Sequence, residues 1–527
     1  MVSMNMHLLY FTIFFTILAL IGGIIAMHSP NKSDFFFAGR NLSIFRLYGV
    51  SFAAMVGTGS SIGALGYGYI NGWAGALYGL GGGIGIILTG YLFARMRKYQ
   101  FMSLPEEISY YYGANPIIMH VTTIWDVFIS LSWLAIHIMG GGLLLSTIIF
   151  YISGLSIDVH ITQAFVTLSI ALILILGGFI GLVWTNIIMA IILFGGFSLI
   201  AVFIVANEGG VTEVIAKAEF FESQISNYLN WGRTSFLGIK KVGVFPAISL
   251  MVSITIGVMA TSSFRHFIYA TERPKTVKHA YLVCGLTYFI FSFIPALLGI
   301  TAFVIAQREG IALTDSDQTF AYLVFRILPY SFGIFAIIVA LSATISSATS
   351  AIFAGHMSLL RDVIPLLKNH APAKKYLPYI SRVTIIIMIF CAWLIAVIVN
   401  DGIMHYITEN AAVIMSGIFV ITILGKYWEK ASWIGALAAL SAPVIYWLWE
   451  MFFHTHNIIF FKYPIIFSII FSFGCGIIFS LLFPCKRLSP RAARWFLKRQ
   501  RTKVDLTETA DYNSSVELPK SGTNNRL

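Results

Sequence analysis

A succession of long apolar segments, separated by shorter polar ones, constrains the fold of this chain more than any other feature. A membrane helix needs about 20 apolar residues to cross a bilayer, and about thirteen such segments follow one another here. Only 11% of the 527 residues are charged, against roughly 25% in soluble proteins. The pattern predicts an all-α polytopic membrane protein. The segments span approximately residues 8–27, 46–70, 73–94, 116–152, 161–181, 183–206, 245–268, 281–306, 332–358, 383–400, 404–425, 432–453 and 461–483.

The charged residues sort the loops into two groups. Acidic residues concentrate in 207–243 and 307–320, whereas basic residues concentrate in the loops after odd-numbered segments. Because positively charged loops stay in the cytoplasm, we expect an external N-terminus and a cytoplasmic C-terminus. The net charge of +12 then reflects topology and anionic lipid, and not a nucleic-acid partner. The basic stretches are 28–46, 95–103, 262–280, 361–382 and the tail from 486.

The second apolar segment contains an unusual stretch at 51–68, with the sequence SFAAMVGTGSSIGALGYG. Glycine weakens a helix by about 1 kcal/mol relative to alanine. Backbone groups freed in the hydrocarbon region must find partners in the protein or in a water-filled cavity. The stretch therefore predicts a discontinuous helix that holds an ion or a solute on exposed carbonyls. Close packing of helices on small residues is the alternative interpretation.

Five motifs, in order along the chain, resemble the sodium:solute symporter family, which includes bacterial proline and pantothenate carriers and sodium–glucose cotransporters. They are DFFFAGRNLS (34–43), FAAMVGTGSSIGALGYGY (52–69), SLPEEISYYYG (103–113), GGFIGLVWTNIIMAI (177–191) and ALSATISSATSAI (340–352). The resemblance implies a LeuT-like core of two inverted five-helix repeats. In each repeat the first helix is discontinuous, and solute and ions bind near mid-membrane.

The apolar segments, together with the two repeats that the resemblance implies, predict a division of the chain into six regions. A first helix and cytoplasmic loop occupy 1–45, and the first repeat occupies 46–206. An external loop follows at 207–243, and the second repeat at 244–426. Two further helices occupy 427–485. We expect the remaining residues, 486–527, to form a cytoplasmic tail that is basic at first and then disordered.

Alignment with the family implies a sodium site built from backbone carbonyls and two neighbouring side-chain positions. Its members here are Ala53, Val56, Ala340, Ala343 and Thr344. Ala343 stands where the family usually has serine, so one hydroxyl ligand is missing. Ser346 and Ser347 lie within about 60° of the same helical direction but most of a turn further along, so they are not automatic substitutes.

The two discontinuous helices also supply candidate contacts for a solute. By position these are Gly57, Thr58, Ser60, Ser61, Ser262 and Ser263. Hydroxyls in membrane helices often bond to their own backbone instead. The polar and aromatic residues with which glucose carriers bind sugar are replaced by Gly79, Gly257 and Ala260, which argues against a sugar.

Three further polar residues are candidates for ion or proton coupling. Asp126 lies about ten residues into its segment, near 15 Å deep, and a carboxylate at that depth is a functional hypothesis by default. His137 returns to within about 20° of the same face, so the pair is a candidate proton relay or cation site. Hydrogen bonding of Asp126 to neighbouring helices is the alternative. Asn186 replaces an aspartate that the family links to coupling.

Together these features predict a secondary symporter of an inner or plasma membrane, which couples uptake of a small organic solute to the sodium gradient. The alternatives are a proton-coupled carrier that uses Asp126 and a transporter-like sensor with weak transport. We expect no enzyme activity, no cofactor and no transition metal, because phosphate loops, nucleophile motifs and metal-ligand clusters are absent from the sequence. The four cysteines lack metal-ligand or redox spacing.

Overall fold

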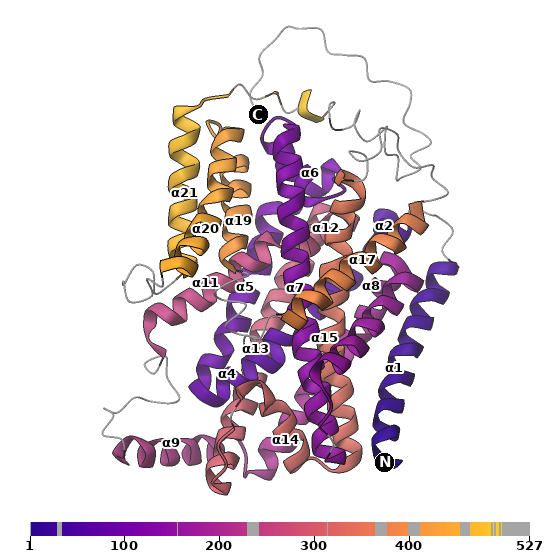
Figure 1. The fold of residues 1–527 in the computed structure, drawn as a ribbon, viewed down its shortest axis with the longest axis vertical. Coiled ribbons are helices and arrows are strands. Elements are labelled where there is room, and N and C mark those ends of the chain that lie inside the picture. The colour runs from indigo at the N-terminus through magenta and orange to yellow at the C-terminus, as the bar shows by residue number, and fades with distance from the viewer. Residues whose placement is uncertain are drawn as a thin grey trace.

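The computed structural model is a bundle of helices (Figure 1). It describes residues 2–28, 34–154, 156–228, 242–313, 315–363, 377–398, 412–453 and 464–485, and a few positions of the tail. Within these ranges there is no β-strand, only a single bridge between Leu42 and Thr271. The predicted all-α class is therefore confirmed.

The helices follow one another in the order expected from the apolar segments. The longer ones are α1 (Val2–Met27), α3 (Ile44–Met55), α5 (Leu77–Phe93), α7 (Pro116–Ser153), α8 (Val159–Asn207), α9 (Val211–Tyr228), α11 (Val244–Ala260), α13 (Pro274–Glu309), α15 (Tyr330–Ser358), α17 (Leu377–Ile398), α19 (Ala412–Tyr427), α20 (Trp433–Phe453) and α21 (Pro464–Leu482). The shorter ones are α2 (Asp34–Phe37), η1 (Ala38–Arg40), η2 (Gly59–Gly63), α4 (Ala64–Asn71), η3 (Gly72–Ala76), η4 (Ala94–Tyr99), α6 (Leu104–Tyr111), α12 (Ser262–Ala270), η5 (Ser316–Gln318), α14 (Thr319–Ile327) and η6 (Leu359–Val363).

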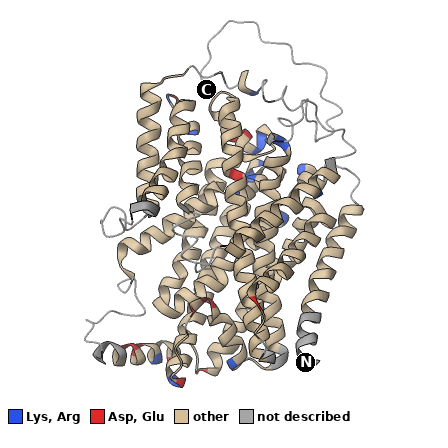
Figure 2. Ribbon diagram, viewed as in Figure 1, with Lys and Arg blue, Asp and Glu red and all other residues tan. Residues whose placement is uncertain are grey.

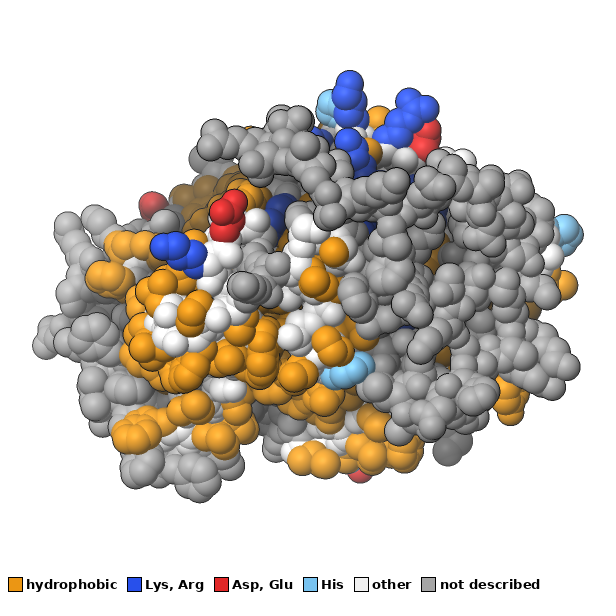
Figure 3. Space-filling model, turned by 90° about the horizontal axis from the view of Figure 1, so that it is seen from above, with side chains coloured by type: hydrophobic (Ala, Val, Ile, Leu, Met, Phe, Trp, Pro, Cys, Tyr) orange, Lys and Arg blue, Asp and Glu red, His pale blue; other side chains and the backbone are white. Residues whose placement is uncertain are grey.

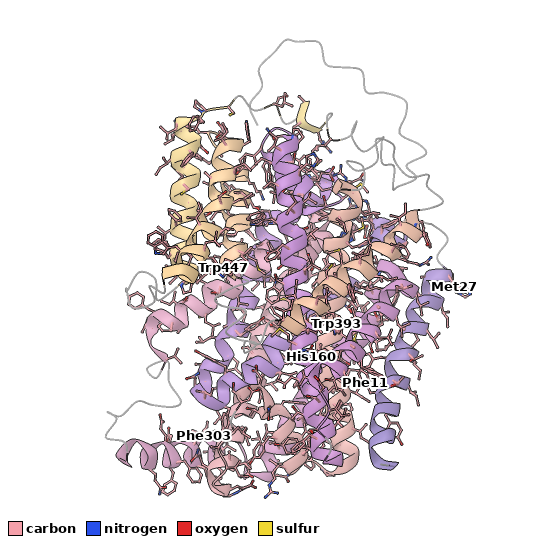
Figure 4. All side chains as sticks on the ribbon, in the orientation of Figure 1. Phe11, Met27, His160, Phe303, Trp393 and Trp447 are labelled. Atoms are coloured by element: carbon pink, nitrogen blue, oxygen red, sulfur yellow. The ribbon has the colours of Figure 1, made fainter. Side chains whose placement is uncertain are left out.

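Helices α7 and α15 form the centre of the bundle, and α1 and α21 lie at its edge (Figure 1). In the most apolar windows of α7 and α15, 83% and 78% of the residues are buried, against 33% for α1 and 28% for α21. Phe11 of α1 packs on Phe165 of α8, whereas Met27 at the end of α1 is exposed (Figure 4). Apolar residues on the outer faces, such as Ile191 and Ile470, are 67% and 65% exposed. The outer surface therefore suits a lipid environment.

Helix α8 is interrupted at Gly178. Its 49 residues would extend over roughly 74 Å as a straight helix, more than twice the thickness of a hydrocarbon core of about 30 Å. Gly178 adopts φ 52° and ψ −152°, and a Cβ at this position would lie 2.5 Å from the Phe35 ring. Glycine therefore permits both the backbone conformation and the close approach. The two expected segments at 161–181 and 183–206 correspond to the two halves of α8.

Two other spans are discontinuous, in agreement with the expectation for the first helix of each repeat. The second span breaks between α3 and η2, where Val56 and Gly57 leave the helix. The seventh breaks between α11 and α12, which are bent by 44° at Thr261. Thr261 is in extended conformation, with φ −73° and ψ 130°.

The ends of the molecule differ in charge (Figure 2). Several basic segments meet at the end that carries α6 and α12, and a view onto this end shows Lys and Arg at its rim (Figure 3). Arg40 donates to the carbonyls of Phe101 and Tyr269, and Arg494 donates to Lys98 O. These hydrogen bonds join four of the basic stretches that we expected to share one side of the membrane.

The number of spans stays a prediction. Among the described residues, eight helices are long and apolar enough to cross a membrane, or nine if the bent pair counts as one span, and three shorter apolar helices accompany them. The start of α1 and the end of α21 lie at opposite ends of the bundle (Figure 1). This placement agrees with an odd number of crossings.

Two polar segments of the sequence form helices. The acidic stretch at 207–243, expected as a loop, contains helix α9. The segment at 104–113 forms α6, whose Glu106 and Glu107 are completely buried inside the protein. A charged segment this deeply buried requires ion partners, and the protein supplies them, as described below. The tail beyond 497 and the start of the eleventh segment lie outside the described residues.

Candidate functional site

The first break is stabilised by its own serines. Val56 ends α3 with φ −79° and ψ 77°, away from helical geometry. Ser60 Oγ accepts a hydrogen bond from Gly57 N at 3.0 Å and donates to Met55 O at 3.0 Å. Ser61 Oγ donates to Gly57 O at 2.7 Å. These two candidate solute contacts therefore satisfy local backbone groups, which is the alternative role that we considered for them.

Helix α15 supplies hydroxyls to the carbonyls just before the break. Ser346 Oγ donates to Ala53 O at 2.8 Å. Ser347 Oγ donates to Ala54 O at 2.8 Å and lies 3.3 Å from Ala53 O. From the helical directions alone, we did not expect Ser346 and Ser347 to replace the hydroxyl that is missing at Ala343. The structure shows that both nevertheless reach the carbonyls of α3.

The other expected members of the sodium site lie around the same contact between α3 and α15. Thr344 Oγ1 is 3.1 Å from Thr58 Oγ1 and 3.5 Å from Ala340 O. Ala343 is buried and contributes no side-chain oxygen. Val56 lies at the break itself. Hydroxyl and carbonyl oxygens at an interrupted helix are the ligands with which transporters coordinate Na⁺.

A cavity with about 560 Å³ of empty space, part of it open to solvent, lies between the two broken helices. No side chain that lines this cavity carries a carboxylate, an ammonium or a guanidinium group. Its polar lining residues are Tyr78, Trp133, His137, Thr261, Ser263, Tyr288, Ser347 and Ser350.

Only some of the candidate solute contacts reach this cavity. Gly57 and Ser263 line it, whereas Thr58, Ser60 and Ser61 do not. Ser262 does not line it either, and its hydroxyl is buried without a hydrogen-bond partner among the described residues. The break in each discontinuous helix therefore contributes one lining residue from our candidate set.

His137 connects the cavity with the first break. Its Nδ1 lies 3.1 Å from Thr58 Oγ1, and its ring is nearly parallel to that of Trp133, with 6.4 Å between the centroids. A Cβ at position 57 would lie 2.7 Å from His137 Cε1 and 2.7 Å from Ser347 Oγ. Glycine at this position allows the imidazole and the serine to approach the interrupted backbone.

The expected pairing of Asp126 with His137 is not seen. Asp126 Oδ2 accepts a hydrogen bond at 2.6 Å from the Oγ of Ser358, the last residue of α15. His137 bonds instead to Thr58. Eleven residues along a helix separate two side chains by roughly 16 Å, so sharing a helical face does not bring them together. Asp126 takes the alternative role, as a hydrogen-bond acceptor between helices.

Asn186 links α8 to α15. Its Nδ2 donates to Ser350 Oγ at 2.9 Å and to Ser346 O at 3.3 Å. Its Oδ1 is buried and has no hydrogen-bond partner among the described residues. The side chain therefore contacts the helix that carries the candidate ion ligands, next to Ser346.

Sequence reasoning missed several aromatic residues of the cavity. Tyr288 of α13 donates from its hydroxyl to Met55 O at 2.9 Å, directly at the break. Tyr78 of α5 and Trp133 of α7 line the cavity, and the indole Nε1 of Trp133 is buried without a hydrogen-bond partner in the described chain. Apart from its position in an apolar segment, nothing in the sequence distinguishes such an aromatic from a lipid-facing one.

A separate cluster of charges anchors α12, the second half of the other broken helix. Arg265 lies 2.8 Å from Glu107, and both side chains are almost fully buried. Tyr111 and Tyr269 donate hydrogen bonds to the same carboxylate, and Arg265 lies 3.1 Å from the centroid of the Phe93 ring. Burial, together with the neighbouring Glu107 charge, raises the pKa of Tyr111, which keeps this hydroxyl protonated as a donor.

A second buried pair lies beside the first. Glu106 is 3.2 Å from Arg361 of η6, and both are at most 3% exposed. Met102 N donates to the Glu106 carboxylate at 2.7 Å. We call Glu106, Glu107, Arg265 and Arg361 the buried ion cluster. It joins α6, α12 and η6 at the end of the molecule where the basic segments meet.

Comparison with known proteins identifies relatives among transporters. A model of the Sodium:solute symporter family matches residues 35–442. The high-affinity proline transporter PutP of Bacillus subtilis (strain 168) is 24% identical over 316 residues, which cover 59% of this chain and 62% of that transporter. That match thus spans less than two thirds of the relative. The sodium/glucose cotransporter of Vibrio parahaemolyticus is 24% identical over 460 residues, 80% of each chain.

A solved structure shows the same fold. A Na⁺-coupled sialic acid symporter, in a substrate-bound outward-open state, superposes with a TM-score of 0.73 at 17% sequence identity. The match covers 92% of this chain and 99% of that one. It confirms the LeuT-like fold class. Because the family model covers well over half of the sequence, this chain belongs to the sodium:solute symporter family.

Proposed function

We propose that this protein is a secondary active symporter that takes up a small organic solute together with Na⁺ by alternating access. One observation carries the proposal. At the first break, carbonyls of α3 meet hydroxyls of α15 beside a cavity that both broken helices line. Such interrupted helices provide ion and solute sites in transporters.

The proposed sodium site uses the carbonyls of Ala53, Val56 and Ala340 and the Thr344 hydroxyl. These oxygens replace the water shell of Na⁺ without a full negative charge. Ala343 offers no hydroxyl, and Ser346 is the nearest replacement, because it already bonds to Ala53 O. Gly57 and Ser263 are the proposed solute contacts from our candidate set, since both line the cavity.

We further propose a topology and a location. The basic segments at the α6 and α12 end would face the cytoplasm, with the N-terminus outside and α9 in the external segment 207–243. The two repeats would occupy 46–206 and 244–426, and the protein would lie in an inner or plasma membrane. It would act as a transporter and not as an enzyme, with Na⁺ as coupling ion and no cofactor.

Uptake into proteoliposomes tests the proposal. The purified full chain would be offered a panel of radiolabelled amino acids, carboxylic acids, amides and amines. Each solute would be measured under an inward Na⁺ gradient, under a proton gradient and in K⁺ alone. We expect at least one solute to accumulate only with Na⁺. Failure of every solute to accumulate, with intact ²²Na⁺ binding, would favour the sensor alternative.

The structure lends less support to proton coupling through Asp126. Its carboxylate bonds to Ser358 near one end of α15 and does not line the cavity. A proton released there would need a further path to the solute. Accumulation driven by a proton gradient in Na⁺-free buffer would nevertheless revive this alternative.

A further inference from the structure

Three side chains from three segments form a hydrogen-bonded chain between the proposed ion site and the cavity. Thr344 Oγ1 of α15 lies 3.1 Å from Thr58 Oγ1 at the first break. Thr58 Oγ1 in turn lies 3.1 Å from His137 Nδ1 of α7. All three residues are buried. His137 lines the cavity, and its ring contacts Thr58 through Nδ1.

The direction of the protons in this chain depends on the ion site. A hydroxyl has one proton and two lone pairs. When Thr344 Oγ1 gives a lone pair to Na⁺, its proton must point away from the cation. Of its two neighbouring acceptors, Ala340 O is 3.5 Å away and is itself a proposed sodium ligand, whereas Thr58 Oγ1 is 3.1 Å away. The proton therefore goes to Thr58.

The same constraint then passes to the histidine. Once Thr58 Oγ1 accepts a hydrogen bond from Thr344, its own proton is free to be donated to His137 Nδ1. A neutral imidazole carries its proton on only one of its two nitrogens. If Nδ1 accepts, then Nε2 is protonated, and it becomes a hydrogen-bond donor toward the cavity.

We propose that Na⁺ binding at Thr344 orders this chain so that His137 presents an Nε2–H donor to the solute. The solute would then carry a matching acceptor, a carbonyl or carboxylate oxygen. The proposal rests on the sodium site of the proposed function, and it names the chemical class of the solute. It links the ion to the solute through two hydroxyls and an imidazole, without direct contact between them.

Nitrogen NMR of protein labelled with ¹⁵N-histidine tests the ordering directly. The full chain in proteoliposomes would be measured in saturating NaCl and in KCl, and ²²Na⁺ binding would be recorded on the same samples. The chain has 12 histidines, so the signals of His137 are assigned by their loss in His137→Gln. We expect Na⁺ to favour the tautomer protonated at Nε2.

The outcomes separate the two proposals. Sodium binding without a change at His137, or with a shift to the tautomer protonated at Nδ1, overturns the hydrogen-bonded chain and leaves the proposed function standing. Absence of ²²Na⁺ binding to the wild-type protein overturns both. Sodium binding with the expected tautomer supports both.

Two variants of Thr58 test whether the effect passes through its hydroxyl. Thr58→Val removes the hydroxyl at nearly constant volume, and Thr58→Ser keeps it. Each variant would be measured at a Na⁺ concentration that saturates it in its own ²²Na⁺ titration. We expect the Na⁺ effect on His137 to disappear in Thr58→Val and to persist in Thr58→Ser. A full effect in Thr58→Val would overturn the proposal.

The solute class has its own test in the uptake panel. We expect every solute that Na⁺ drives into the vesicles to carry a carbonyl or carboxylate oxygen. For such a solute, His137→Leu, which has no donor, should raise the half-saturating concentration by about tenfold, the effect of one lost hydrogen bond with its partner left unsatisfied. Sodium-driven accumulation of a simple alkylamine, which has no such oxygen, would overturn the proposed class.

Discussion

The two discontinuous helices are held in place by opposite kinds of chemistry. The first, at Val56 and Gly57, is surrounded by hydroxyls, carbonyls and an imidazole, beside a cavity without a charged wall. The second ends in α12, which is fixed by the ion pair between Arg265 and the fully buried Glu107. The first break is thus surrounded by neutral groups, which can form hydrogen bonds with several alternative partners. Helix α12 is held by charged groups, which need an opposite charge when they are buried.

The difference in energy between these contacts suggests a division of labour. A neutral hydrogen bond contributes about 1 kcal/mol net, so the hydroxyls around the first break can exchange partners for an ion or water at little cost. Removing one partner of a buried ion pair costs about 3–5 kcal/mol. We therefore expect the first break to adapt to its ligands, and α12 to move only together with α6 or after water reaches the buried ion cluster.

The largest expected effect is at the buried ion cluster. Glu107→Gln leaves Arg265 buried without its counter-charge, so we expect a loss of about 3–5 kcal/mol in stability, seen as a lower thermal unfolding temperature in detergent. Glu213→Gln is the matched control, because Glu213 is 55% exposed and lies 3.7 Å from Lys217; its change should stay within about 0.5 kcal/mol. Equal effects would erase the contrast between the two regions.

The next effect is at the proposed ion site. Thr344→Val removes one oxygen ligand, and a hydrogen bond or contact to a charged group is worth about 1.5–3 kcal/mol. We expect the Na⁺ concentration for half-maximal binding to rise by about 10-fold or more, measured with ²²Na⁺. Thr344→Ser, which keeps the hydroxyl, should remain near wild type. An unchanged Na⁺ affinity in Thr344→Val would show that the neutral region holds its ion elsewhere.

The third prediction concerns close packing at the break. In Gly57→Ala the new Cβ would lie 2.7 Å from both His137 Cε1 and Ser347 Oγ, and overpacking of this kind costs about 1–3 kcal/mol. We expect lower thermal stability and weaker solute uptake. Gly195→Ala is the control, since a Cβ there meets no atom within 4 Å. If both variants behave alike, the first break is looser than its contacts imply.

The smallest effect is expected at Asp126. Asparagine keeps an oxygen that can accept the hydrogen bond from Ser358, so Asp126→Asn should cost about 1 kcal/mol or less in stability. Na⁺-driven uptake should change by less than about threefold, because the carboxylate lies outside the cavity wall. If Asp126→Asn abolished proton-driven uptake but left Na⁺-driven uptake intact, Asp126 would instead take part in proton coupling. The transport mechanism would then depend on a charged group outside the cavity.

The sequence was sufficient for the features that depend on local composition. Apolar length located the helices, and the five glycines of 51–68 located the first break, because glycine and hydroxyl residues weaken a helix where they stand. The boundary expected between the segments 161–181 and 183–206 lies close to the break at Gly178, where a positive φ requires glycine. The resemblance at 340–352 also directed attention to the helix that meets this break.

Only the tertiary structure decided which side chains meet. Ser346 and Ser347 reach the carbonyls of α3, although helical directions from an intact helix did not favour them. Helix α15 is continuous at these serines, so a rotation of about 100° per residue gives the direction of each side chain. It does not give the position of the α3 carbonyls along α15, which depends on how the two helices pack. Asp126 and His137 share a face of α7, but they lie roughly 16 Å apart along it, so each meets a different partner.

The buried ion cluster makes the same point over a longer range. Glu107 and Arg265 stand 158 positions apart, so the polar segment 104–113 does not by itself reveal its ion partner. A charge buried in the apolar interior of this chain must be paired, wherever it stands in the sequence. Which residue pairs with it depends on how α6 and α12 pack, and that is decided by the fold as a whole.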